Sequence, residues 1–119
     1  MEFRADLTRR SDRLAVVTVA GEVDLFTAPK FDEMLTRGID EGSRQVIVDF
    51  SEVTFIDSTA LSVLVVGGKR LRLDGRELLI VCGLGNVRRL IQIAGLASVF
   101  VVYQTLAEAL AAVETNSLA

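Results

Sequence analysis

The sequence of 119 residues contains no histidine, no tryptophan, one proline and one cysteine. Without histidine the chain lacks the usual general base, the Ser-His-Asp arrangement and the commonest metal ligand. The single cysteine, Cys82, excludes an internal disulfide bond and favours a reducing compartment. Carboxylate pairs and carboxylate-only metal sites stay open, but we expect a protein that is not an enzyme and that has no catalytic residue, cofactor site or metal site.

Long apolar runs and clusters of positive charge are also missing. The longest apolar run, residues 60–66, is far shorter than the ~20 residues that span a bilayer, and the N-terminus MEFRADLTRR has no apolar signal core. The net charge of −3 and the scattered basic residues argue against binding to nucleic acid. We therefore expect a cytoplasmic protein that binds neither a membrane nor a nucleic acid.

Hydrophobic periodicity predicts one domain over residues 1–119, with a frayed tail at 114–119. Thr27 is the predicted N-cap of a helix with Pro29 in its first turn, and Gly42 should close that helix. The predicted strands are 3–7, 14–20, 45–50, 77–82 and 99–103, with strand-like character continuing from residue 50 to 55. The other predicted helices are 60–73, 87–94 and 106–113.

From the second strand onward, strands and helices alternate. This pattern is typical of right-handed crossovers and a parallel sheet, with the first two strands as an antiparallel edge. The predicted fold class is α/β: a mixed, mostly parallel sheet of about five strands packed with about four helices.

Asp57 and Ser58 stand at a junction between a strand and a helix, where open α/β sheets bind ligands and partners. Both are also good N-cap residues, so a purely structural role is about as well supported by the local sequence. Helical spacing predicts that the core-facing side of the following helix carries Leu61, Leu64, Val65, Gly68 and Leu71. The opposite side carries Thr59, Ser62, Val63, Val66 and Arg70, with Ser58 at its edge.

The valines on the outer side indicate either a docking surface or a helix that is buried more completely than its pattern suggests. A phosphoryl group on Ser58 would add about −1.5 to −2 charge. The helix N-terminus tolerates an anion, so the fold should survive. A partner packed on Val63 and Val66 would be repelled by the dianion beside Asp57.

Three segments resemble the bacterial anti-sigma factor antagonists of the STAS-domain family: GEVDLFTAPKF (21–31), VIVDFSEVTFIDSTALSVLVVGGKRLR (46–72) and VRRLIQIAGLASVF (87–100). The resemblance implies that Ser58 is a phosphoacceptor and that Asp24 contacts the partner, although Asp24 suits a turn nearly as well. The family commonly has glycine where Ala60 stands, and often where Ser62 stands, which bears on partner choice.

The resemblance further implies two protein partners. An anti-sigma factor serine kinase would supply ATP and Mg²⁺, and the unphosphorylated chain would bind it and release its sigma factor. A metal-dependent serine phosphatase would reset the switch. The alternative is the STAS subunit of a lipid-transporting ABC system, which docks on the transporter's ATPase without needing phosphorylation. An enzyme with Ser58 as nucleophile is a third reading, but no activating base can be named.

Overall fold

A single five-stranded sheet organises the computed structural model, which describes residues 2–118 and the side chains as far as residue 114. The strands are β1 (Arg4–Arg9), β2 (Leu14–Val23), β3 (Gln45–Ile56), β4 (Glu77–Val81) and β5 (Val101–Tyr103). The helices are α1 (Ala28–Asp40), α2 (Ser58–Leu73), α3 (Asn86–Ile93) and α4 (Leu106–Leu118), with a short 3-10 helix, η1 (Leu96–Ser98).

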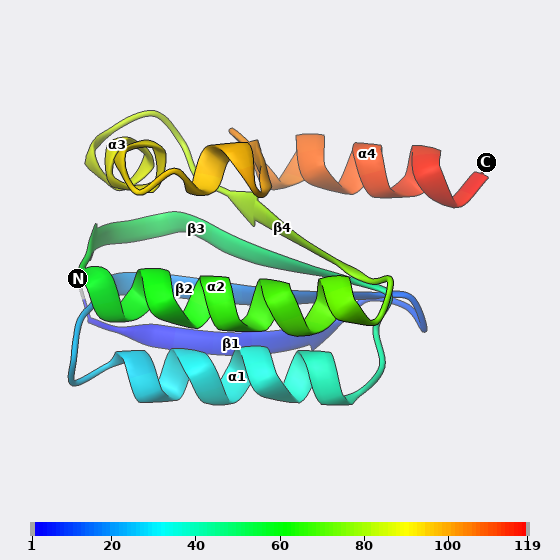
Figure 1. The fold of residues 1–119 in the computed structure, drawn as a ribbon, viewed down its shortest axis with the longest axis horizontal. Helices are drawn as coiled ribbons and strands as arrows, with labels where there is room; N and C mark the ends of the chain where they lie inside the picture. Colours follow the sequence, from blue (N-terminus) through cyan, green and yellow to red (C-terminus); the bar gives the residue numbers. More distant parts are fainter. Residues whose placement is uncertain (1, 119) are drawn as a thin grey trace.

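The strands lie side by side in sequence order, and only β1 runs antiparallel to its neighbour. The remaining pairs are parallel. Helix α1 packs against β1 and β2, and helix α2 packs against β3 and β4 on the same face of the sheet. Helix α4 lies on the other side of β3 and β4 (Figure 1). The predicted α/β class, with its mixed and mostly parallel sheet, is confirmed.

Alternation along the strands divides the core into two clusters. On β3, Val46 and Val48 pack in the larger cluster with α1, α2 and α3, whereas Ile47 belongs to the smaller cluster. Ala109 and Val113 of α4 cover that second cluster. Apolar residues on both faces explain why the central strands read as nearly continuous hydrophobic runs.

Two strands are longer than predicted. β2 continues to Val23 and β3 to Ile56, and the pairing between them contains two register irregularities. β4 pairs with β3 only as far as Asp49, so the second half of β3 has a strand on one side alone. This half of β3 corresponds to residues 50–55, for which the sequence predicts strand-like character, and most of its side chains are exposed.

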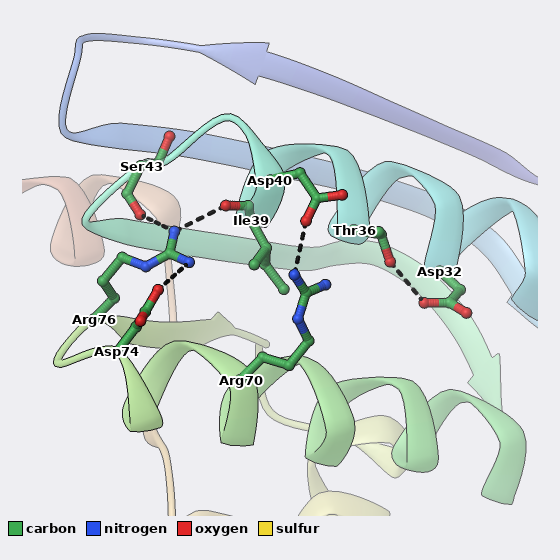
Figure 2. Close-up of polar contacts among 8 residues, drawn as sticks. All are labelled: Asp32, Thr36, Ile39, Asp40, Ser43, Arg70, Asp74 and Arg76. Carbon is green, nitrogen blue, oxygen red and sulfur yellow. Dashed lines mark hydrogen bonds and ion pairs between the residues drawn. The ribbon is translucent and has the colours of Figure 1, made fainter.

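Helix α2 packs unusually closely through Gly67 and Gly68. A Cβ atom on Gly67 would lie 2.8 Å from Cδ2 of Leu35 on α1, and one on Gly68 would lie 2.3 Å from Cε1 of Phe100. At the exposed edge of the same helix pair, Arg70 Nη2 donates to Asp40 Oδ1 over 2.7 Å (Figure 2).

The predicted core face of α2 was partly wrong. Val65 is 45% exposed rather than buried, and Val63 is half-buried against the larger core cluster rather than exposed. The helix turns Gly67 and Gly68 toward the core, because the absence of side chains there allows Leu35 and Phe100 to pack directly against its backbone. The buried residues are Ala60, Leu64, Gly67, Gly68 and Leu71.

The expected fraying of residues 114–119 stays a prediction. The backbone of α4 is helical as far as Leu118, but the side chains of 115–118 and all of residue 119 lie outside the described residues.

The predicted end of α1 agrees with the structure. Gly42 follows the end of α1 with a positive φ of 88°, as its predicted role in closing that helix requires.

Candidate functional site

The carboxyl ends of β2 and β3 bring two loops together. Val23 and Ile56 are partners in the strand register, and the Asp57 N–H donates to the Val23 carbonyl over 3.2 Å. The loop that leads into α1 therefore lies beside the first turn of α2. Strand register, rather than proximity in sequence, places Asp24 and Asp57 in one site.

Asp57 is the N-cap of α2, with an extended backbone. Its Oδ1 accepts from the Thr59 N–H at 2.9 Å and also from the Thr59 hydroxyl. The Thr59 hydroxyl is the main reason that the Asp57 pKa lies below its ordinary value; the backbone N–H groups of Thr59, Ala60 and Leu25 act in the same direction, and desolvation opposes them. Asp57 is therefore ionised at neutral pH. Its backbone N–H also joins the start of α2 to the end of β2, at Val23.

Asp24 organises the loop between β2 and α1. Its Oδ1 accepts from the N–H groups of Phe26 and Thr27, at 2.9 and 3.1 Å. The Thr27 hydroxyl accepts from the Asp24 N–H at 2.9 Å and donates to the Glu22 carbonyl at 2.9 Å. Thr27 does hold the N-cap position of α1, but its side chain makes no capping bond because it is used in this turn.

This turn leaves two large apolar side chains in water. Leu25 is 66% exposed and Phe26 is 88% exposed. Asp24 and Thr27 fix the backbone on either side of them, so the loop presents them beside Asp57. This pair was not predicted from the sequence; an apolar dipeptide between two turn-forming residues was the available signal.

Ser58 is the first residue of α2 and is exposed. Asp57 already accepts hydrogen bonds from the backbone N–H and the hydroxyl of Thr59, the residue that follows Ser58. A negatively charged group on the Ser58 hydroxyl would therefore lie beside an ionised carboxylate and would have to share these donors.

A shallow groove of about 340 Å³ begins at Ser58 and runs between α2 and the segment that joins α3 to η1. Its walls are mainly apolar, and Val66 on its rim is 61% exposed. The lining residues are Ser58, Leu61, Ser62, Val65, Val66, Ala94 and Leu96. Ser62 and Val66, two of the predicted partner-binding residues, therefore line the same groove as Ser58, together with Val65, Ala94 and Leu96.

Two of the predicted partner-binding residues lie elsewhere. Val63 does not line the groove, and it packs on the core. Arg70 is 12 residues from Ser58 along α2, which is about 18 Å at 1.5 Å per residue, and it pairs with Asp40 of α1. Thr59 is close to Ser58, but its hydroxyl and N–H both serve Asp57. Asp24, Asp57, Thr59, Ser62 and Val66 thus lie at this end of the sheet or along the groove, and Val63 and Arg70 do not.

Comparison with known proteins identifies the family of this chain. The family model for the STAS domain matches residues 7–109. The chain belongs to the STAS domain family. Among its relatives in this family is the anti-sigma-B factor antagonist of Staphylococcus aureus, which is 35% identical over 89 residues, covering 75% of this chain and 82% of that protein. The Staphylococcus epidermidis protein of the same name is 35% identical over 80 residues, covering 67% of this chain and 74% of that protein.

Solved structures of STAS proteins share the fold. An anti-sigma factor antagonist from Mycobacterium paratuberculosis superimposes with a TM-score of 0.87 at 28% identity, over 95% of both chains. The Bacillus protein SpoIIAA in its phosphorylated form has a TM-score of 0.73 at 19% identity, over 92% of this chain and 99% of that one. At this identity SpoIIAA supports the fold alone. None of the STAS-domain helices within residues 2–118 has the length and apolar content needed to cross a membrane.

Proposed function

We propose that this chain is an anti-sigma factor antagonist that works as a phosphorylation-gated binding protein. Its unphosphorylated form binds an anti-sigma factor serine kinase and so releases the sigma factor, and phosphorylation of Ser58 blocks that binding. The observation that carries the proposal is the placement of an exposed serine beside an ionised aspartate, at the mouth of an apolar groove.

The docking surface consists of the groove and the exposed loop on the other side of Asp57. Val65 and Val66 supply apolar contact on α2, and Leu25 and Phe26 supply it on the loop. Exposed apolar side chains that lie on both sides of a polar centre are typical of a protein interface with a few anchor residues. The kinase would cover both parts while the Ser58 hydroxyl enters its active site.

Phosphorylation would act through charge at this surface. A phosphoserine carries about −1.5 to −2 charge at neutral pH. Beside Asp57, it adds to an existing negative charge that the partner would have to desolvate on docking. The position at the start of α2 favours anions, so the fold should be retained.

The chemistry of phosphoryl transfer would come from the partners. The kinase brings ATP, Mg²⁺ and a catalytic base, and a metal-dependent serine phosphatase removes the phosphoryl group. This chain contributes the acceptor hydroxyl and the surface that orients it, so it is a substrate and a binding protein and needs no cofactor, nucleic acid or membrane for this role.

The test uses wild-type, Ser58→Ala, Ser58→Asp and Ser11→Asp proteins as baits in native lysate. The matched control adds the same charge at Ser11, an exposed turn residue in the β1–β2 connection whose hydroxyl accepts from the Arg13 N–H, an acceptor role that Asp can also fill. The recovered partner is then purified, its affinity for each variant is measured, and each variant is incubated with it, ATP and Mg²⁺.

The proposal expects an ATP-dependent serine kinase that binds the wild type, Ser58→Ala and Ser11→Asp but not Ser58→Asp. It also expects phosphorylation of the wild type and Ser11→Asp but not of Ser58→Ala. Equal recovery of a transporter ATPase by all four baits would establish the alternative, a docking subunit of an ABC system. Phosphorylation of Ser58→Ala would place the acceptor elsewhere.

A further inference from the structure

Three arginines stand in register at the amino-terminal edge of the parallel sheet, the edge opposite to Ser58. Each of Arg13, Arg44 and Arg76 directly precedes the first residue of β2, β3 or β4. The Gln45 N–H donates to the Arg13 carbonyl at 2.9 Å, and the Glu77 N–H donates to the Arg44 carbonyl at 3.0 Å. Adjacent strands are about 4.8 Å apart, so these side chains start close together.

The side chains are directed toward one face of the sheet. Val46 lies two residues after Arg44, and Leu78 lies two residues after Arg76. Both pack in the larger core cluster. Because strand side chains alternate between faces, Arg44 and Arg76 belong to that face as well, beside α2. Arg72, in the last turn of α2, approaches from the helix.

These arginines line a cavity of about 540 Å³. Ligand pockets for small molecules are commonly about 300–1,000 Å³. One side of this cavity is basic, with Arg13, Arg44, Arg72 and Arg76, and another is apolar, with Val99 and Phe100. The shape and chemistry suit a molecule that has an anionic group and an apolar part.

Arg76 is already fixed in place. Its Nη1 donates to the carbonyls of Ile39 at 2.8 Å and Ser43 at 3.1 Å, and its Nη2 donates to Asp74 Oδ2 at 2.9 Å (Figure 2). These bonds join the end of α1 to the start of β4 and explain Arg76 on structural grounds. The Asp74 carboxylate also compensates the positive charge of Arg76.

Arg13, Arg44 and Arg72 have no such explanation. Among the residues with described side chains, none of these three takes part in an ion pair. Glu77, the acid that lines the cavity, accepts instead from Gln45 Nε2 at 3.1 Å. Arg72 suits the carboxyl end of a helix, but that reason does not extend to Arg13 and Arg44.

Like charges on neighbouring strands are destabilising, and this chain is acidic overall, with a net charge of −3. From the unpaired arginines in register and the cavity that they line, we infer that this edge of the sheet is a binding site for a small phosphorylated molecule. Guanidinium groups bind phosphate through two parallel hydrogen bonds. Arg13, Arg44 and Arg72 hold the phosphate, and Phe100 contacts the apolar part.

The experiment titrates the full chain with inorganic pyrophosphate, inorganic phosphate and a short polyglutamate peptide, at low and high ionic strength. Binding is measured by calorimetry and located by the shifts of backbone amide NMR signals. The test variant is Arg13→Gln/Arg44→Gln. The matched control, Arg37→Gln/Arg89→Gln, removes the same charge from two exposed arginines that lie outside the cavity.

We expect pyrophosphate to bind the wild type and to shift the amide signals of Gln45 and Glu77. The test variant should bind at least about tenfold more weakly, because each charged hydrogen bond that is lost is worth about 1.5–3 kcal/mol, whereas the control should change less than about twofold. The test variant should also unfold at the same temperature as the wild type or higher, since like charges have been removed.

Three results would overturn the inference. Equal weakening in the test and control variants would mean attraction to net charge alone. Saturation by the peptide but not by pyrophosphate would assign the edge to an acidic protein segment. A lower unfolding temperature in the test variant, with no pyrophosphate binding to the wild type at low ionic strength, would make the arginines structural.

Discussion

Replacing Asp57 tests the link between the fold and the candidate site. The carboxylate caps α2 and accepts from both the hydroxyl and the backbone N–H of Thr59. Loss of an N-cap acceptor costs about 0.5–2 kcal/mol. Because the Thr59 hydroxyl also loses its acceptor, we expect Asp57→Ala to lower the free energy of unfolding by about 1–2 kcal/mol.

The assay is equilibrium unfolding in urea at pH 7, with thermal unfolding as a second measurement. A loss of about 1–2 kcal/mol should lower the unfolding temperature by about 4–8 °C in a domain of this size. The control, Asp12→Ala, removes a fully exposed carboxylate in the β1–β2 turn and should stay within about 0.5 kcal/mol of the wild type. Equal stability of Asp57→Ala and Asp12→Ala would refute the capping role.

A double-mutant cycle with Thr59→Val isolates the side-chain pair. Val keeps the shape of Thr59 and removes its hydroxyl, so Asp57→Ala should cost less in the Thr59→Val background than in the wild type. We expect a coupling energy of at least about 0.5 kcal/mol. Strict additivity would mean that the hydroxyl contributes nothing to holding the carboxylate.

The hydrogen bonds to Asp57 also make its contribution to stability depend on pH. The Asp57 pKa in the folded protein lies below its ordinary value of 3.8, so the native state favours the ionised form. Its contribution is fully present above the unfolded-state pKa and is lost as pH falls through the folded-state pKa. The difference in stability between wild type and Asp57→Asn should therefore be largest near neutral pH and narrow below 3.8. A difference that grows in acid would contradict this reasoning.

Two further predictions concern positions on either side of the site. Gly68→Ala should destabilise the protein by about 1–3 kcal/mol in urea unfolding, because the new Cβ would lie 2.3 Å from Phe100. Helix propensity alone predicts the opposite, a gain in stability of about 1 kcal/mol. The loss should shrink in a Phe100→Ala background, and a gain in stability would show that the ring moves aside freely. Phe26→Ser should leave the free energy of unfolding within about 0.5 kcal/mol of the wild-type value, since the ring is 88% exposed. It should nevertheless weaken binding of the proposed kinase by at least about fivefold. Unchanged affinity in a titration would show that the loop is not part of the docking surface.

Periodicity was sufficient for most of the fold, because nearly every element buries an apolar face. Alternating strands and helices indicated the parallel sheet, and Gly42 indicated where α1 ends. The junction at Asp57 and Ser58 was also singled out from sequence, since the carboxyl ends of strands are where open α/β sheets bind ligands and partners.

The rotation of α2 was not predictable from hydrophobicity. A helical wheel assigns Val65 to the core because valine is apolar, but Gly67 and Gly68 decide the packing by allowing Leu35 and Phe100 to approach. The close approach depends on residues far away in the sequence. Val65 therefore lines the groove and Val63 does not, and the docking surface that we propose lies closer to α3 than the sequence predicted.

Strand register also determines features that no local pattern records. Pairing of Val23 with Ile56 brings the exposed loop to Ser58, and pairing of Leu14 with Gln45 aligns Arg13 with Arg44 at the other edge. The 16 residues of α2 separate the two edges by about 24 Å. That is about three Debye lengths at physiological ionic strength, so charge changes at Ser58 and at the arginines should act independently. Each proposed site can therefore fail its test without altering the outcome for the other.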